Sequence, residues 1–291
     1  MHPLVGPVVA WYAVAARDLP WRAADRTPWG VLVSEVMLQQ TPVARVEPVW
    51  RDWLTRWPTP RDLATAPTAE VLRTWGTLGY PRRALRLQEA ARAVVERHHG
   101  ALPASESELR ALPGVGAYTA AAVAAFAFGR RAVVLDTNVR RVLARVLDGA
   151  AQPPAHLTAA ETARAAGVVP GDDATAARWS VAVMELGALV CTARAPRCTA
   201  CPVADLCGWR RAGYPAPDTR PRTQAWAGTD RQARGRLMAV LRSASAPVTA
   251  GELADAWPDE TQRDRALASL VADGLVARHD GAAAPTYGLP G

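Results

Sequence analysis

The sequence contains no lysine, so all 34 of its basic side chains other than histidine are arginine. A Schiff base on a side chain needs a lysine amine, and chemistry of that kind is therefore excluded for this chain. Long apolar runs are missing as well. The longest, residues 120–128, is far shorter than the roughly 20 residues needed to span a bilayer. Because we also find no secretory signal, we expect a cytoplasmic protein with no membrane partner.

The length and charge of the chain allow about two domains and favour a polyanionic partner. The chain has 291 residues, and its hydrophobic content of 49% supports sizeable cores. The net charge is +7 and the sequence pI is near 9.9, a balance that suits binding to nucleic acid. Since many soluble proteins are basic, the charge alone does not identify the partner.

Residues 1 to about 210 are predicted to be almost wholly helical. Apolar residues recur there at three- and four-residue spacing, for example in 31–36, 85–94 and 139–146. Residues 213–230 are rich in Pro, Arg, Thr and Gly and are predicted to be a linker. The expected fold class is therefore mainly α, with a small separate domain at the C-terminal side.

Residues 231–291 are predicted to form that separate domain. Its expected elements are three helices and a hairpin: 234–243, 250–256 with Thr249 as N-cap, 260–273, and strands at 275–278 and 286–289. This order resembles a winged helix-turn-helix, whose third helix here carries Gln262, Arg263 and Arg265 for DNA contacts. Acidic residues lie in the same region, so a docking or purely stabilising domain is an equal alternative.

The chain has only four cysteines, and they lie within seventeen residues: Cys191, Cys198, Cys201 and Cys207. Four thiolates so close together are able to ligate one [4Fe–4S] cluster. A four-thiolate zinc site uses the same ligands, although zinc ribbons usually contain two short CxxC pairs and this segment contains one. Two disulfides rank behind both, because such bridges persist in oxidising compartments. The spacing favours iron–sulfur over zinc.

A second motif is the turn Leu112-Pro113-Gly114-Val115-Gly116, between two predicted helices. The two glycines let the backbone turn tightly and approach a ligand closely. The helix that follows offers free N–H groups and a partial positive charge to a phosphate. Such a helix-hairpin-helix is able to hold one DNA strand without reading its sequence. By itself a Pro-Gly-x-Gly turn is weak support, because it joins helices in many proteins.

A hairpin, an apolar segment that ends in Asp136, and a four-cysteine cluster follow one another in this chain. This order resembles the helix-hairpin-helix DNA glycosylase superfamily over residues 1–210. Within it the chain is most similar to adenine DNA glycosylases of the MutY type, at four motifs: Leu19-Pro20-Trp21-Arg22, Ser34-Glu35-Val36-Met37-Leu38-Gln39-Gln40-Thr41, Leu78-Gly79-Tyr80 and Met184-Glu185-Leu186-Gly187-Ala188-Leu189-Val190-Cys191.

The resemblance implies an enzyme that excises adenine mispaired with 8-oxoguanine or guanine in double-stranded DNA. It implies a helical barrel module at 24–136, a cluster module made of 1–23 and 137–212, and Glu35 facing Asp136 between them. We expect a monomer that works in the bacterial cytoplasm, associated with the nucleoid.

Two alternatives remain at this point. Endonuclease III, a glycosylase for other damaged or mismatched bases, shares the hairpin, the aspartate and the cluster, but has a lysine where this chain has Tyr118. Without lysine, strand cleavage through an imine is not available, so a monofunctional glycosylase is expected. A non-catalytic DNA-binding regulator is the other alternative, and it requires no special carboxylates.

The resemblance also implies roles for individual residues. Glu35 is the expected general acid that protonates adenine, and Asp136 the carboxylate that stabilises the sugar cation. Tyr118 and Asn138 match positions that support these two carboxylates. The expected DNA-binding residues include the two wedge residues beside the lesion, Gln40 and Tyr80, and two residues near the extruded adenine, Trp21 and Arg22. Thr41 and the hairpin residues are also expected to bind DNA: Leu112, Gly114, Val115 and Gly116.

The sequence departs from the family pattern in three ways. Pro81 stands where a second tyrosine is common, and Val181 where a Gln or Glu often lines the adenine pocket. The usual domain that checks for 8-oxoguanine exceeds a hundred residues, and the segment after the linker is too short to supply it. The C-terminal unit is therefore expected either to replace part of that role or only to add DNA affinity.

Overall fold

The structure is a computed structural model that describes residues 1–217, 226–281 and 284–291. Its described residues fall into two compact units. The first consists of residues 1–35, 102–111 and 115–217, and the second of residues 36–101, 112–114, 226–281 and 284–291. These bounds differ from the modules expected from the sequence, which stay a prediction. No helix among the described residues has both the length and the apolar character that a membrane span requires.

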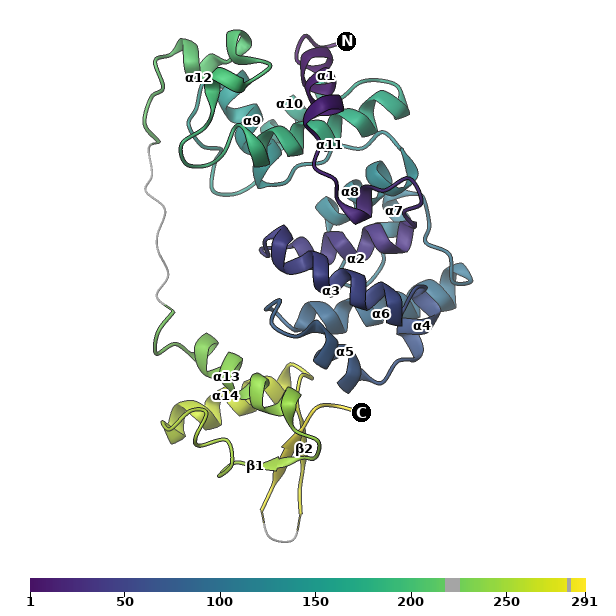
Figure 1. The fold of residues 1–291 in the computed structure, drawn as a ribbon, viewed down its shortest axis with the longest axis vertical. Helices are drawn as coiled ribbons and strands as arrows, with labels where there is room; N and C mark the ends of the chain where they lie inside the picture. Colours follow the sequence, from purple (N-terminus) through teal and green to yellow (C-terminus); the bar gives the residue numbers. More distant parts are fainter. Residues whose placement is uncertain (218–225, 282–283) are drawn as a thin grey trace. The chain divides into compact units, whose positions relative to one another are not determined.

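The first unit is helical and is built around one long helix, α11 (Figure 1). Its elements are α1 (Val5–Ala15), η1 (Pro20–Arg22), the first part of α2 (Pro28–Leu38), α7 (Glu106–Arg110), α8 (Ala117–Phe128), α9 (Thr137–Leu147), α10 (Ala159–Val168), α11 (Asp173–Leu189), η2 (Cys198–Ala200), η3 (Ala204–Leu206) and α12 (Gly208–Arg211). Helix α11 packs against α1 and α9, and apolar side chains of all three share one core. The N-terminal helix is thereby joined to the segment that carries Asp136 and the cysteines.

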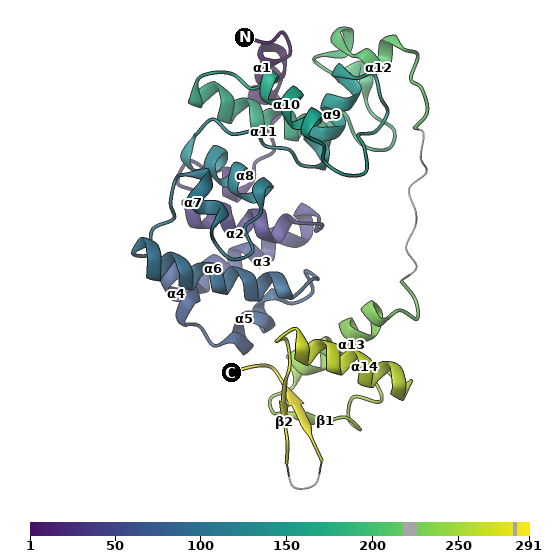
Figure 2. The same ribbon diagram turned by 180° about the vertical axis from the view of Figure 1, so that it is seen from behind.

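The second unit holds the remaining helices and the small sheet, seen from behind in Figure 2. Its elements are the end of α2, α3 (Val43–Arg56), α4 (Pro60–Thr65), α5 (Thr68–Trp75), α6 (Arg82–His98), α13 (Asp230–Ser243), β1 (Val248–Thr249), α14 (Glu260–Ala272), β2 (Ala277–His279) and β3 (Thr286–Gly288). Helix α6 packs on α4 and α5, and its buried Gln88 donates to the carbonyls of Leu63 and Ala66. The ring of Trp53 lies edge-on to Trp57 and Trp75 in the same core.

Side-chain caps explain where several helices begin. Thr59 and Thr158 form reciprocal capping boxes with Asp62 and Glu161, and the carboxylate of Asp172 accepts from the Thr175 N–H. Each cap satisfies an N–H group that the first helical turn leaves without a partner. Within residues 1–217 the structure contains helices and no strand, which confirms the mainly helical prediction.

The C-terminal part of the second unit, residues 226–281 and 284–291, is called the C-terminal unit below. It differs from the prediction in its second helix. Residues 250–256 form hydrogen-bonded turns instead, so the expected helix there is wrong. Thr249 still accepts from the Glu252 N–H, but Pro258 has no N–H to continue a helix and disfavours helical backbone at Trp257.

The two predicted strands pair as expected. β2 and β3 are antiparallel, with Arg278 opposite Tyr287, and β1 pairs with the other edge of β3 to give the order β1-β3-β2. The first helix of the unit begins at Asp230, earlier than predicted, because Thr229 caps it. Part of the predicted linker, 218–225, lies outside the described residues.

Candidate active site

Glu35 lies on α2 and is buried, with 6% of its surface exposed. Tyr118, in the first turn of α8, donates its hydroxyl to Oε2 of Glu35 at 2.7 Å. Burial raises the pKa of Glu35 to about 7, the negative charge of Asp136 adds to this, and the Tyr118 hydrogen bond and the Arg22 charge oppose it. A carboxyl group with that pKa still holds its proton near neutral pH. It therefore meets the requirement for a general acid.

Asp136 is the N-cap of α9, and both of its carboxylate oxygens are engaged. Oδ1 accepts from the Val139 N–H at 2.6 Å, and Oδ2 accepts from the Asn138 side-chain amide at 2.7 Å. Burial raises the pKa of Asp136, while these two donors and the Arg141 charge favour its anion. The capping role and a catalytic role are compatible, because capping fixes a carboxylate whose charge acts on Glu35.

Two residues that the sequence did not single out hold Asn138 in place. Arg141 donates to Oδ1 of Asn138 at 2.7 Å and to the carbonyls of Gly187 and Cys191, each at 2.8 Å. A Cβ atom on Gly187 would lie 2.7 Å from Cβ of Asn138, so only glycine allows α11 to approach the start of α9 this closely. An arginine three residues after Asn138 in the same helix was the available sequence signal.

The segment Trp21–Arg22 lies in η1 of the same unit. Trp21 is buried, and the Nη2 atom of Arg22 donates to the fully buried carboxylate of Glu185 on α11 at 2.9 Å. The charge of Arg22 acts on Glu35, as the opposing contribution to its pKa shows. Val181, the departure from the family pattern, is also on α11. In the sequence, Glu185 belonged to one of the family motifs, but no role was predicted for it.

The predicted hairpin turn is present between α7 and α8. Gly114 has a φ of 73°, and a Cβ atom there would lie 2.7 Å from Cβ of Arg86, so glycine is required. Gly116 is the N-cap of α8 and provides no side-chain cap. The N-terminus of a helix offers backbone N–H groups and a partial positive charge to a phosphate. The side chains of Leu112 and Val115 are buried, so these two residues have only backbone groups to offer.

The two expected wedge residues share an uncommon backbone conformation. Gln40 has a φ of 57° and Tyr80 a φ of 48°, in the left-handed region that side chains other than glycine seldom adopt. Such conformations cost about 1–3 kcal/mol each and persist where the surrounding structure imposes them. Tyr80 is 41% exposed, which is compatible with the predicted contact with DNA.

Arg83 imposes this conformation on both loops. Its Nη1 donates to the carbonyls of Val36, Met37 and Gln39, and its Nη2 to Thr41 Oγ1 at 3.2 Å and to the Gly79 carbonyl at 3.0 Å. Thr41 Oγ1 in turn donates to the Leu78 carbonyl at 3.2 Å. Through this hydrogen bond the buried Thr41 joins the loop of Gln40 to the loop of Tyr80. No pattern in the sequence distinguished Arg83 from the other arginines.

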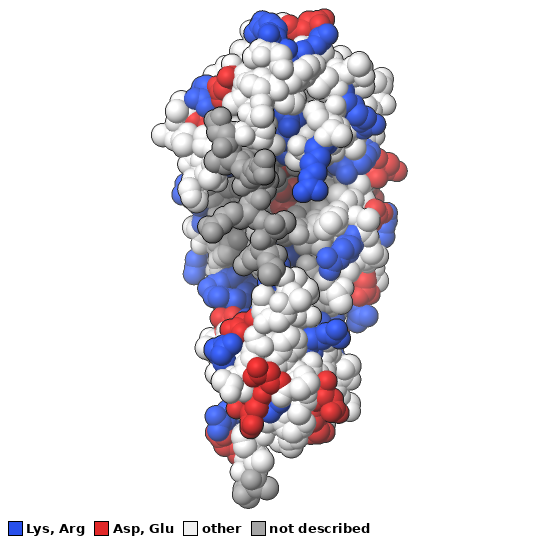
Figure 3. Space-filling model, turned by 90° about the vertical axis from the view of Figure 1, so that its left-hand side faces the viewer, with Lys and Arg blue, Asp and Glu red and all other residues white. Residues whose placement is uncertain are grey.

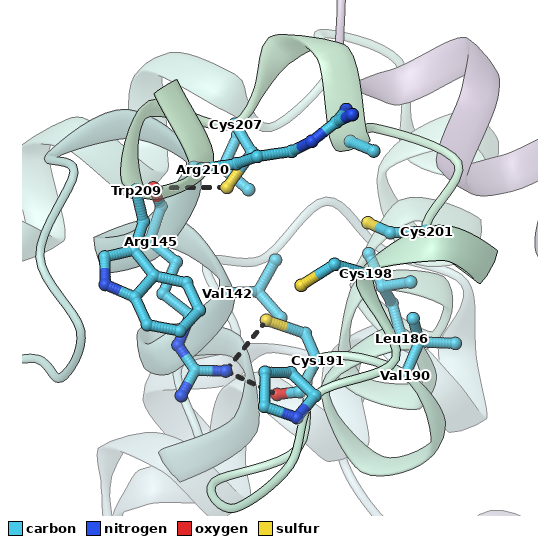
Figure 4. Close-up of a pocket in the computed structure, with 13 residues that line it drawn as sticks. Val142, Arg145, Leu186, Val190, Cys191, Cys198, Cys201, Cys207, Trp209 and Arg210 are labelled. Atoms are coloured by element: carbon cyan, nitrogen blue, oxygen red, sulfur yellow. Dashed lines mark hydrogen bonds between the residues drawn. The ribbon is translucent and has the colours of Figure 1, made fainter. Parts of the chain in front are cut away.

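The four cysteine thiols line one pocket, whose walls include Val142, Leu186, Val190 and Trp209 (Figure 4). All four are free thiols, so no disulfide joins them. Four thiols around one pocket are the ligand set that a [4Fe–4S] cluster requires.

Arginines complete the surroundings of this pocket. Arg145 donates to Cys191 Sγ at 3.4 Å, and its guanidinium lies 4.6 Å from the ring centre of Trp209. Two of the surface arginines near the cysteines form contacts with other residues of the chain. Arg197 donates to the Leu189 carbonyl, and Arg210 pairs with Asp205 at 2.7 Å. Positive charge beside the thiolates suits an anionic cluster.

Comparisons with known proteins agree with this geometry. The family described as HhH-GPD superfamily base excision DNA repair protein matches residues 33–166, and the iron–sulfur binding domain of endonuclease III matches residues 191–207. The adenine DNA glycosylase of Mycobacterium tuberculosis H37Rv is 55% identical over 98% of this chain and 92% of its own. The chain belongs to the adenine DNA glycosylase family.

Two further comparisons support the same assignment. The adenine DNA glycosylase of Mycolicibacterium smegmatis is 52% identical over 94% of this chain and 92% of its own. A solved structure of a thermostable thymine-DNA glycosylase has a TM-score of 0.65 at 29% identity, covering 72% of this chain and 95% of that one. The predicted DNA glycosylase fold and the four-cysteine [4Fe–4S] site are therefore confirmed, against the zinc and disulfide alternatives.

Proposed function

We propose that this glycosylase removes adenine mispaired with 8-oxoguanine or guanine by hydrolysing the N-glycosidic bond, without cleaving the strand. The observation that carries the proposal is the Tyr118–Glu35 hydrogen bond beside the doubly engaged Asp136, all within one compact unit. A buried acid that keeps its proton and a nearby fixed carboxylate are the two groups that this reaction needs.

The chemistry assigns a different task to each group. Adenine must leave the DNA stack, at a cost of a few kcal/mol, before any side chain reaches it. Glu35 then protonates the purine ring as the glycosidic bond breaks, because the adenine anion is a poor leaving group. Asp136 stabilises the positive charge that develops on the sugar. Tyr118 and Asn138 hold the two carboxyl groups in orientation.

The lack of lysine limits the reaction to base removal. Tyr118 occupies the position where endonuclease III carries lysine, and its hydroxyl is committed to Glu35. No imine forms without a lysine amine, so the product is an abasic site in an intact strand. The [4Fe–4S] cluster, when bound, supplies cross-linking of residues 191–207 and thereby supports the loop beside α9.

The other expected residues have DNA contacts in this proposal. Tyr80 and Gln40 insert beside the lesion, held ready by Arg83 and Thr41. The hairpin turn before α8 binds a phosphate through backbone N–H groups. Trp21 and Arg22 face the extruded adenine. The partner is double-stranded DNA with an A:8-oxoguanine or A:G mispair, bound by a monomer in the bacterial nucleoid.

The C-terminal unit supports the proposal through its contact with Tyr80. The guanidinium of Arg231, on α13, lies 4.5 Å from the ring centre of Tyr80 and 5.3 Å from that of Trp226. Arg82 on α6 pairs with Asp273 beyond the end of α14 at 3.3 Å. These contacts bring a cation and an aromatic ring next to the expected wedge.

The third predicted helix of that unit, α14, has few basic groups free for DNA. Arg265 and Gln262 both donate to Asp230, and Arg263 is buried and donates to the Trp257 carbonyl. In Figure 3 acidic side chains lie beside basic ones on the elements from α13 to β3, at the foot of the view. The unit therefore acts through Arg231 beside Tyr80, in our proposal, rather than as a winged helix that reads a groove.

Glycosylase assays with parent protein and Glu35→Gln test the main proposal. Duplexes carry adenine opposite 8-oxoguanine, guanine, cytosine or thymine, and the base released in a single turnover is measured. We expect the parent to act on the first two, and Glu35→Gln to be slower by about 10²- to 10⁴-fold, the usual contribution of a general acid. A variant as fast as the parent refutes the assignment of Glu35 as the general acid.

Arg231→Ala tests the role of the C-terminal unit, with Arg236→Ala on the same helix as its control. We expect Arg231→Ala to reduce the preference for 8-oxoguanine over guanine opposite adenine. If both variants keep the parent's preference, the unit does not read the lesion. An equal loss of affinity for every duplex would leave it the simpler role of adding DNA affinity.

A further inference from the structure

Glu185 is the most completely buried carboxylate of the first unit, with none of its surface exposed. It accepts four hydrogen bonds: Oε1 from the Arg17 backbone N–H at 3.0 Å and from Arg17 Nε at 2.7 Å, and Oε2 from Arg17 Nη2 at 2.7 Å and Arg22 Nη2 at 2.9 Å. Burial by itself raises the pKa of Glu185, but these bonds outweigh it and bring the pKa to about 2. Glu185 is therefore an anion at every pH at which the protein works.

Arg17 alone is sufficient to neutralise this carboxylate. Its guanidinium is bound to both oxygens, the bidentate arrangement that pairs most strongly with a carboxylate, and its backbone N–H adds a third bond. Arg22 contributes only one bond from Nη2. Because the charge of Glu185 already has a bidentate partner in Arg17, the surroundings of Arg22 must explain its presence there.

The environment of Arg22 indicates what that explanation is. Its guanidinium lies 5.8 Å from the ring centre of Tyr12, and its Nη1 is buried without a hydrogen-bond partner among the described residues. A buried donor left unpaired costs about 1–3 kcal/mol. An unsatisfied donor of this kind is expected where a ligand completes the site.

Arg22 is also one of the charged groups that act on Glu35. Three groups act on Glu35: Tyr118 from α8 through its hydrogen bond, and Asp136 from the start of α9 and Arg22 from η1 through their charges. Burial and Asp136 raise the pKa of Glu35, and Arg22 lowers it. The position of the Arg22 guanidinium therefore influences how readily Glu35 gives up its proton, and Glu185 determines that position.

We propose that Glu185 is a positioning residue, which fixes Arg22 beside Glu35 with Nη1 directed to an acceptor nitrogen of the extruded purine. The inference deepens the proposed function and rests on it. Arg17 is the permanent counter-ion of Glu185 in this arrangement. Arg22 is then free to serve the bound base, because its charge is not needed to compensate Glu185.

Glu185→Gln in the full, cluster-loaded chain tests the inference. Single-turnover excision opposite 8-oxoguanine is measured across a pH series that includes the basic side, where deprotonation of Glu35 slows the reaction. We expect the rate at neutral pH to fall about 10- to 100-fold, the range for loss of a hydrogen bond to a charged group. We also expect the basic limb to move to higher pH, because a displaced Arg22 no longer favours the Glu35 anion.

Glu161→Gln is the matched control. Glu161 is a buried glutamate of the same unit, 8% exposed, and accepts from Arg140 Nε at 3.0 Å and Nη2 at 3.1 Å. Its loss damages a comparable ion pair that does not face Glu35. We expect Glu161→Gln to lower the thermal midpoint as Glu185→Gln does, and to leave the basic limb where it is.

Two further variants keep the inference open to refutation. Glu185→Asp retains the charge and is expected to return the basic limb toward that of the parent. Arg22→Gln is expected to move the limb as Glu185→Gln does, and the double variant no further, since both act through one guanidinium. If Glu185→Gln keeps the parent's limb, or Glu161→Gln moves it equally, Glu185 is only structural. That result leaves the proposed function standing, which fails instead if Glu35→Gln excises adenine normally.

Discussion

The unusual pKa of Glu35 predicts a pH-dependent gain in stability for Glu35→Gln. Glutamine has the same size and keeps an acceptor for the Tyr118 hydroxyl, but it has no charge to bury. The pKa of Glu35 is raised from 4.5 to about 7 in the folded protein. Because the folded state holds this proton more tightly, the parent is relatively stable below pH 4.5. It loses that stability as the pH rises through about 7.

The size of the effect follows from the shift. One pKa unit corresponds to about 1.36 kcal/mol, so full ionisation of Glu35 costs the folded parent about 3 kcal/mol. Part of that cost is already present at about pH 5. Between about pH 5 and pH 8.5, the advantage of Glu35→Gln over the parent is expected to grow by about 2.5 kcal/mol. For a domain of this size, that corresponds to about 5–10 °C in thermal midpoint.

Thermal unfolding of cluster-loaded parent and variant, at the same scan rate in both buffers, measures the difference. Glu96→Gln, at an exposed glutamate of α6, serves as the control for removing one negative charge. We expect the gap between parent and Glu35→Gln to widen at the higher pH, and the control to show no such widening. A gap that is the same in both buffers would mean that Glu35 titrates normally and is not a stored acid.

Three other predictions concern the groups around this acid. Asp136→Asn keeps an oxygen for the Val139 N–H, so we expect normal folding by circular dichroism and single-turnover excision slower by about 10²- to 10³-fold. Gly187→Ala places a Cβ atom against Asn138 and is expected to cost about 1–3 kcal/mol in urea unfolding, whereas Gly167→Ala, with open space around it, is expected to be neutral. Arg83→Lys keeps the charge but loses the guanidinium fork, and is expected to bind mispaired DNA about tenfold more weakly in a titration, with less change in rate at saturating enzyme. An excision rate of Asp136→Asn equal to that of the parent would contradict the role of Asp136. An equal loss of unfolding free energy in both glycine variants would contradict the close contact at Gly187, and an unaltered DNA affinity of Arg83→Lys would contradict the role of Arg83.

Much of the site could be predicted from the sequence because its groups are local. The four cysteines lie within one short segment, and their spacing predicted the cluster site that the family comparison confirmed. Asp136 stands directly before an amphipathic helix, where an aspartate caps the helix in any fold. The absence of lysine excludes imine chemistry whatever fold the chain adopts, because no arrangement of the backbone supplies the missing amine.

The C-terminal unit shows where local patterns were insufficient. Thr249 as a possible N-cap predicted a helix over residues 250–256, and the cap forms without the helix. Proline at 258 disfavours helical backbone at the end of this segment. The basic residues of α14 also suggested DNA contacts, whereas in the folded unit Asp230 and the Trp257 carbonyl engage them.

The sequence by itself determined the ligands of the cluster and the exclusion of a lysine nucleophile, and it predicted the two carboxyl groups. Only the tertiary structure decided how strong an acid Glu35 is, because its pKa depends on burial and on charges that come from η1, α8 and the start of α9. The same holds for Arg83 and Glu185. Each acts on residues far away in the chain, and no spacing rule reveals which of 34 arginines a buried glutamate will hold.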